Sequence, residues 1–244
     1  MKTLYSKYSS QKKSINFNYL KLLFLGLILI IASCNEDDES CEYTEICEEY
    51  CELFEDFEDD KVENPGNWLG LSLNDLQVQL RAGSNVLYVD DGSGASWAYN
   101  TTDFPSDLIA QGCELHYDVE YFAGANNNTA TNNSLVIFDG TSPAASSNIA
   151  SFVLDPASLV ISGNAPVTIE VPLELATETT LPSNTFGAWT INGVNNTTPP
   201  TPADILAFNT LIQNISGVAF FIDEGGNPVE EWWFDNFCFK QCCP

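Results

Sequence analysis

The sequence comprises 244 residues and carries 34 acidic against 8 basic side chains, for a formal net charge of −26. Such an acidic chain repels phosphate backbones, which excludes nucleic acid as a partner. Apolar residues make up 44% of the chain, enough for a packed core. The single histidine argues against catalysis or metal binding by a histidine cluster.

The first 33 residues are typical of a secretion signal. An apolar run over 22–31 follows five lysines, Lys2, Lys7, Lys12, Lys13 and Lys21, and no acidic residue precedes Cys34. The run is about half as long as a transmembrane helix requires. Ile31-Ala32-Ser33-Cys34 resembles the lipobox of bacterial lipoproteins, which implies cleavage after residue 33 and acylation of Cys34, with palmitate as a typical acyl chain. An ordinary signal peptide with an incidental cysteine is the alternative.

The segment 34–52 is predicted to be an acidic, cysteine-bearing tether. Asn35-Glu36-Asp37-Asp38-Glu39 resembles the surface-export signal of Bacteroidetes lipoproteins. The resemblance implies a lipid anchor in the outer membrane, with the protein facing the cell exterior. A solvated acidic spacer is the simpler interpretation of the same residues, and the two are compatible.

Export would place the remaining cysteines where disulfides persist. The disulfide candidates are Cys41, Cys47, Cys51, Cys113, Cys238, Cys242 and Cys243. We expect bridges between the 41–51 and 238–243 clusters that staple the chain ends together, with at least one thiol left over and the connectivity undetermined. A zinc site is the alternative, disfavoured among so many carboxylates. The spacing of Cys47 and Cys51 also predicts a short helix over 44–54.

Residues 53–244 are predicted to form an all-β, antiparallel, jelly-roll-like β-sandwich with one short helix near 202–213. Short apolar segments alternate with turn residues, and Leu115, Tyr117, Val119 and Tyr121 share one face of a strand. Thr201 is a suitable cap for the helix. Strands are expected at 53–58, 76–80, 86–90, 95–99, 113–122, 134–139, 149–154, 167–173, 187–191, 216–223 and 231–239.

Several motifs in the region 85–240 resemble the laminin IV type A domain in their order along the chain. They are Ser96-Trp97-Ala98-Tyr99, Phe104-Pro105-Ser106-Asp107-Leu108, Gly112-Cys113-Glu114-Leu115 and Phe234-Asp235-Asn236-Phe237. The resemblance implies an extracellular module with a structural or adhesive role. The predicted fold also resembles carbohydrate-binding jelly rolls, so fold alone does not choose the function.

Calcium is the cofactor that the sequence favours. Carbohydrate-binding jelly rolls often hold a structural calcium between an aromatic-Glu strand at the start and an Asp-Asn strand at the end. Glu58 and Asp235 occupy such positions and are the candidate ligands, since calcium prefers carboxylate and carbonyl oxygens. Asp90-Asp91-Gly92 and Asp223-Glu224-Gly225-Gly226 are lesser candidates, and solvated acids without an ion are the alternative.

No catalytic residue is predicted, because no nucleophile, metalloprotease or nucleotide-binding motif occurs. The five tryptophans favour core packing or sugar stacking, and the neighbours Trp232 and Trp233 should point to opposite faces of one strand. We therefore expect a non-catalytic surface module, adhesive, structural or ligand-binding, whose partner is a glycan or a surface protein. The alternatives are a carbohydrate-binding accessory lipoprotein of a polysaccharide-uptake system and a secreted glycan hydrolase.

Overall fold

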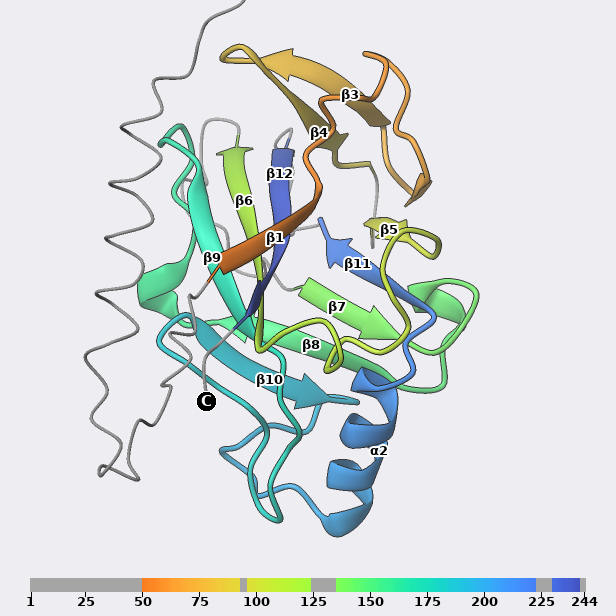
Figure 1. The fold of residues 1–244 in the computed structure, drawn as a ribbon, viewed down its shortest axis with the longest axis vertical. Helices are drawn as coiled ribbons and strands as arrows, with labels where there is room; N and C mark the ends of the chain where they lie inside the picture. The colour runs from red at the N-terminus through yellow and green to blue at the C-terminus, as the bar shows by residue number, and fades with distance from the viewer. Residues whose placement is uncertain (1–49, 93–95, 124–134, 223–229, 242–244) are drawn as a thin grey trace, which may run out of the picture. The chain divides into compact units, whose positions relative to one another are not determined.

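The computed structural model describes residues 50–92, 96–123, 135–222 and 230–241. In these residues twelve strands form two six-stranded antiparallel sheets, with one α-helix and two short 3-10 helices, Pro143–Ala145 and Pro156–Ser158. For this described part of the chain, the predicted all-β antiparallel sandwich with a single α-helix is confirmed (Figure 1). Within the described residues, no helix is long and apolar enough to cross a membrane.

Sheet A contains the longest strands and both ends of the described chain. Its order is β3 (Asp75–Arg81), β4 (Ser84–Asp90), β12 (Glu230–Gln241), β6 (Glu114–Ala123) and β9 (Val167–Pro172). β1 (Tyr50–Glu55) pairs with the C-terminal half of β12, whereas β4 pairs with its N-terminal half. The two strands therefore follow one another along the same edge of β12. The tether predicted over 34–52 overlaps this sheet, since β1 begins at Tyr50.

Sheet B has the order β10 (Gly187–Ile191), β8 (Ile149–Leu154), β7 (Leu135–Phe138), β11 (Gly217–Phe221), β5 (Trp97–Asn100) and β2 (Trp68–Leu71). The predicted strands overlap every strand of the two sheets except β2, a four-residue segment without a clear alternation, although only residues 53–55 of β1 were predicted as strand. The helix predicted over 44–54 is wrong for residues 50–54, which belong to β1. Pairing with β12 overrides the local spacing of cysteines there, and residues 44–49 lie outside the described part.

Alternation along the strands sends one set of side chains between the sheets. On β6, Leu115 and Tyr117 are fully buried, whereas Glu114 and His116 lie on the opposite, outer face of sheet A and are half-buried. Aromatic rings dominate the interior, as where Phe220 of sheet B stacks on Phe234 of sheet A at 4.1 Å between centroids. Burying a ring of this size contributes about 2–3 kcal/mol to folding.

The alternation of inward- and outward-facing side chains along β12 shifts at Asn236. The pairing of β12 with β6 shifts between Asp235 and Cys238, and Asn236 has a φ of 53°. A bulge of this kind adds one residue to a strand, so both Phe234 and Phe237 reach the core, although they are three residues apart. The bulge lies where the edge partner of β12 changes from β4 to β1, which opens a corner in sheet A.

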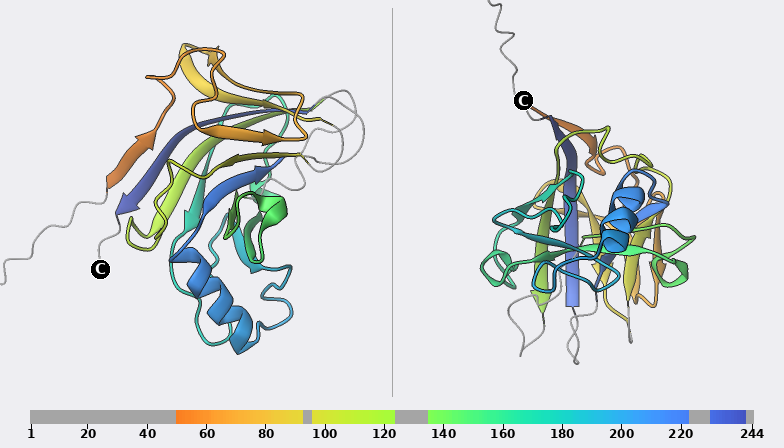
Figure 2. Two further views of the ribbon diagram at one scale, coloured as in Figure 1. Left: turned by 90° about the vertical axis from the view of Figure 1, so that its right-hand side faces the viewer. Right: turned by 90° about the horizontal axis from the view of Figure 1, so that it is seen from below.

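The helix α2 (Pro202–Ile212) begins at a capping box. Thr201 accepts a hydrogen bond from the Asp204 amide, and the Asp204 carboxylate accepts one from the Thr201 amide. Phe208, Leu211 and Ile212 are buried, and the helix contacts β7, β8 and β10 of sheet B (Figure 2).

A disulfide staples the two ends of the described sandwich. Cys51 on β1 is bonded to Cys238 on β12, a separation of 187 residues in the sequence. This bridge joins the two clusters that the sequence predicted to be linked. Cys113 is also disulfide-bonded, to a partner outside the described residues. Cys34, Cys41, Cys47, Cys242 and Cys243 lie outside the described residues.

Candidate functional site

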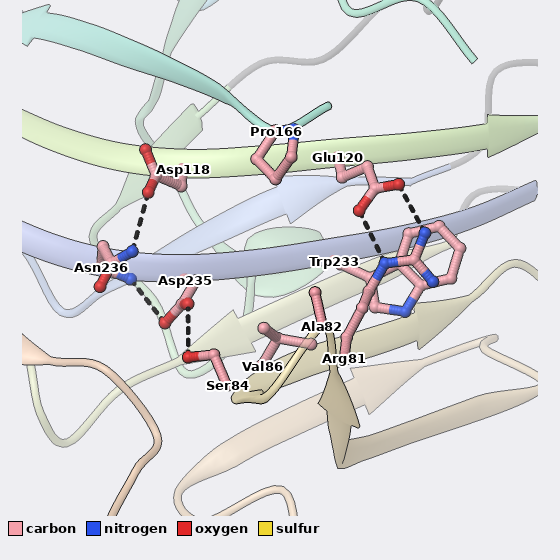
Figure 3. A pocket seen from close by; sticks show the side chains of 10 residues that line it. All are labelled: Arg81, Ala82, Ser84, Val86, Asp118, Glu120, Pro166, Trp233, Asp235 and Asn236. Carbon is pink, nitrogen blue, oxygen red and sulfur yellow. Dashed lines mark hydrogen bonds and ion pairs between the residues drawn. The ribbon is translucent and has the colours of Figure 1, made fainter. Parts of the chain in front are cut away.

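A cavity of about 540 Å³ lies on the outer face of sheet A. Its walls come from β3, β4, β6 and β12, and Figure 3 shows the side chains converging from these strands. The lining residues are Arg81, Ala82, Ser84, Val86, Asp118, Glu120, Pro166, Trp233, Asp235 and Asn236. We call this cavity the sheet A groove.

One end of the sheet A groove is built on Trp233. Trp232 and Trp233 point to opposite faces of β12, as predicted, and both are buried. Trp233 packs against Val86 and Tyr88 in a small apolar cluster separate from the main core. The guanidinium of Arg81 lies 3.6 Å from the centre of the Trp233 ring, and Arg81 Nε donates to Glu120 at 2.6 Å. Stacking and a two-pronged ion pair thus hold this cation in one orientation.

Trp233 Nε1 is buried and forms no hydrogen bond with the described part of the chain. A buried donor of this kind is costly unless a partner satisfies it. Asp118, Glu120 and Asn236 bring acceptors and an amide to the same cavity. The sheet A groove therefore combines an indole ring covered by a fixed cation, several carboxylates and an amide, a set that suits a ligand with hydroxyl groups, which both donate and accept.

The other end of the sheet A groove is lined by Asp235, one of the two predicted calcium ligands, and the second, Glu58, lies beside the groove next to Ser84. The Ser84 hydroxyl donates to Glu58 and lies 3.4 Å from Asp235 Oδ2, so both carboxylates share one hydroxyl. Asp118 faces Asp235 across β6 and β12 and accepts a hydrogen bond from Asn236 Nδ2 at 2.8 Å. The corner between β1 and β4 explains this convergence, because Glu58 follows β1 and Ser84 begins β4.

The carboxylates at this corner repel one another. Burial, together with the charges of Asp118 and Glu58, raises the pKa of Asp235 to about 6, although hydrogen bonds from Asn236 and Ser84 oppose the rise. The Ser84 hydroxyl and the Asn85 amide lower the pKa of Glu58. Carboxylate oxygens are the ligands that calcium prefers, but Glu58, Asp118 and Asp235 are not among the groups of described residues whose ligand atoms all lie within 4.8 Å of one another.

The backbone around the corner is unusual. Phe57, Ala82 and Asn236 all have positive φ, between 53° and 58°. Residues other than glycine rarely adopt this conformation, but Ala82 has it in the two-residue turn Ala82-Gly83 between β3 and β4, and Asn236 has it at the bulge of β12. Each of the three residues neighbours a lining or ligand residue, namely Glu58, Arg81 and Asp235.

The remaining predicted candidates lie elsewhere. Asp90 ends β4 and Asp91 follows it, and burial together with the charge of Asp75 raises the pKa of Asp90. Asp223-Glu224-Gly225-Gly226 lies outside the described residues. Trp68 and Trp189 are core residues, as core packing predicted. Sequence reasoning missed Arg81, Asp118 and Glu120 as site residues, and alternation along β6 was the available signal for Asp118 and Glu120.

A second cavity of about 540 Å³ lies on the outer face of sheet B. It is lined by Trp97, Val136, Ser146, Ser147, Ile149, Ser151, Val153, Thr190, Asn192, Gly193 and Phe221. None of these lining residues is charged, in contrast with the sheet A groove. Trp97 and Phe221 meet edge to face at 4.7 Å. This cavity, the sheet B groove, supplies matched control residues for experiments on sheet A.

Comparison with known proteins supports the fold. No family model and no curated protein matches the chain. The chain is similar to an exo-β-agarase with a TM-score of 0.52 and 14% identity, over 79% of this chain and 25% of the agarase. It therefore spans about a quarter of that enzyme.

Two smaller structures resemble the whole sandwich more weakly. The L4b domain of human laminin α2 gives a TM-score of 0.42 and 13% identity, covering 72% of this chain and 98% of that domain. A mannan-recognising carbohydrate-binding module gives a TM-score of 0.39 and 11% identity, covering 81% of this chain and 100% of the module. At these identities the likeness concerns the fold alone.

Proposed function

We propose that this protein is a non-catalytic binding module that holds a glycan in the sheet A groove and is carried by a lipid-anchored surface lipoprotein. The observation that carries the proposal is the groove itself, where Trp233, an oriented Arg81 and the carboxylates of Asp118 and Glu120 surround one cavity. A polyol satisfies donors and acceptors together. The carboxylates would repel an anionic ligand, and the guanidinium of Arg81 would repel a cationic one.

The lipid anchor is the second part of the proposal. It rests on the lipobox-like sequence Ile31-Ala32-Ser33-Cys34 and on the acidic run that follows. Acylation at Cys34 would hold the sandwich to the outer membrane through the tether. Calcium bound by Glu58, Asp235 and Asp118 would neutralise one end of the groove and fix the corner between β1 and β4. Calcium at this corner would stabilise the fold and take no part in a reaction.

Binding of the full chain to a panel of polysaccharides tests the glycan assignment, with and without EDTA. We expect Trp233→Ala to weaken binding about tenfold, equivalent to about 1.4 kcal/mol. Asp118→Ala should weaken it similarly with less disturbance of the fold. Trp97→Ala, in the sheet B groove, is the matched control and should leave binding unchanged.

Three results would contradict the proposal. If Trp97→Ala weakens glycan binding and Trp233→Ala does not, the binding site would lie in the sheet B groove. If the protein binds none of the polysaccharides, an adhesive or structural role would be favoured. Turnover of a polysaccharide that is lost in Asp235→Asn would favour the hydrolase, since a carboxyl with a pKa of about 6 is suited to general acid catalysis.

A further inference from the structure

A second cluster of potential ligands lies on the outer face of sheet A, beyond the groove. Glu114 and His116 are two residues apart on β6, and Glu170 is the direct partner of His116 on β9. One nitrogen of His116 and one carboxylate oxygen from each glutamate all lie within 4.8 Å of one another. His116 Nε2 is already 2.9 Å from Glu114 Oε2.

We infer that Glu114, His116 and Glu170 form a binding site for a zinc-type divalent transition metal. Ligand atoms about 2.1 Å from a zinc ion lie at most about 4.2 Å apart. Small side-chain rotations would bring the three atoms within that limit. One imidazole and two carboxylates suit zinc, whereas calcium selects oxygen ligands alone.

The surroundings agree with this inference. The Glu170 carboxylate accepts no hydrogen bond from another residue in the described ranges, and so stands ready to bind an ion. The side chains of His116 and Glu114 are only 14% and 22% exposed, which limits competition from water. Three protein ligands leave a coordination position open for a donor from outside the chain.

Two neighbours modulate the site. Lys240 Nζ lies 3.3 Å from Glu114 Oε2, and its charge opposes a cation there. The sulfurs of Cys51 and Cys238 also lie within 4.8 Å of the His116 nitrogen, but they are bonded to each other. Zinc binds cysteine as the thiolate, so the closed disulfide leaves His116, Glu114 and Glu170 as the ligands.

Titration of the full-length, oxidised, metal-free chain with Zn²⁺ tests the inference by calorimetry and by NMR. His116 is the only histidine, so its ring signals are unambiguous. Zn²⁺ should shift them and Ca²⁺ should not. His116→Asn and Glu170→Gln should each weaken zinc binding by roughly tenfold or more. Lys240→Gln should strengthen it, and Glu174→Gln, at an exposed position after β9, should leave it unchanged.

Ring signals that stay in place at saturating Zn²⁺ would overturn the inference, as would equal affinity in His116→Asn and the parent chain. Displacement of zinc by an equal concentration of Ca²⁺ would also overturn it. None of these outcomes bears on glycan binding, because the three ligands do not line the sheet A groove. The inference therefore stands or fails separately from the proposed function.

Discussion

Replacing Asp235 by Asn should stabilise the protein at neutral pH when calcium is absent. The folded chain raises the pKa of Asp235 from 3.8 to about 6, which means that folding favours the neutral carboxyl. This group therefore destabilises the fold progressively as the pH rises from about 4 through 6. A difference of about two pKa units corresponds to about 3 kcal/mol, and partial exposure of the side chain reduces this to about 1–2 kcal/mol.

The assay is urea unfolding of both proteins between pH 4 and pH 8 in EDTA. We expect equal stability near pH 4 and an advantage of about 1–2 kcal/mol for Asp235→Asn at pH 7.5. Adding Ca²⁺ should stabilise only the parent chain and close the gap. A variant that is less stable than the parent at pH 7.5 in EDTA would refute the reasoning.

Asp139→Asn is the matched control with the opposite sign. Burial raises the pKa of Asp139, but the hydrogen bonds from Asn148 and Ser147 outweigh that effect and lower the pKa overall. Its ionised form therefore stabilises the fold, and this contribution is lost as the pH falls through the lowered pKa. Asp139→Asn should destabilise the protein at pH 7.5, and an increase in stability there would contradict the assignment.

Three further outcomes are expected. Cys34→Ala should abolish incorporation of labelled palmitate and release the protein from membranes; a variant that stays labelled would disprove the anchor. Replacing Cys51 and Cys238 by Ser should lower the free energy of unfolding by about 2–5 kcal/mol, because the bridge closes a loop of 187 residues; unchanged denaturant midpoints would contradict this. Thr201→Ala should cost about 1 kcal/mol by removing the cap of α2, measured by urea unfolding, and a neutral effect would show that tertiary contacts alone hold the helix end.

The sequence by itself determined the class of fold and most of its elements. Alternation in 113–122 and 167–173 assigned both strands and the faces of their side chains, because a strand repeats every two residues. Thr201 marked the start of the helix, since an N-cap is local chemistry. Opposite directions for Trp232 and Trp233 follow from the same two-residue period.

Only the tertiary structure decided what meets across the strands. The bulge at Asn236 shifts the alternation of side chains along β12 and turns Phe237 into the core, and no local sequence pattern predicts that bulge. β1 is a strand because β12 offers it an edge, whereas cysteine spacing alone favoured a helix. Arg81 finds Glu120 and Trp233 through pairing between segments that are far apart in sequence. Local propensity acts over a few residues, whereas register and sheet order set the distances between functional groups.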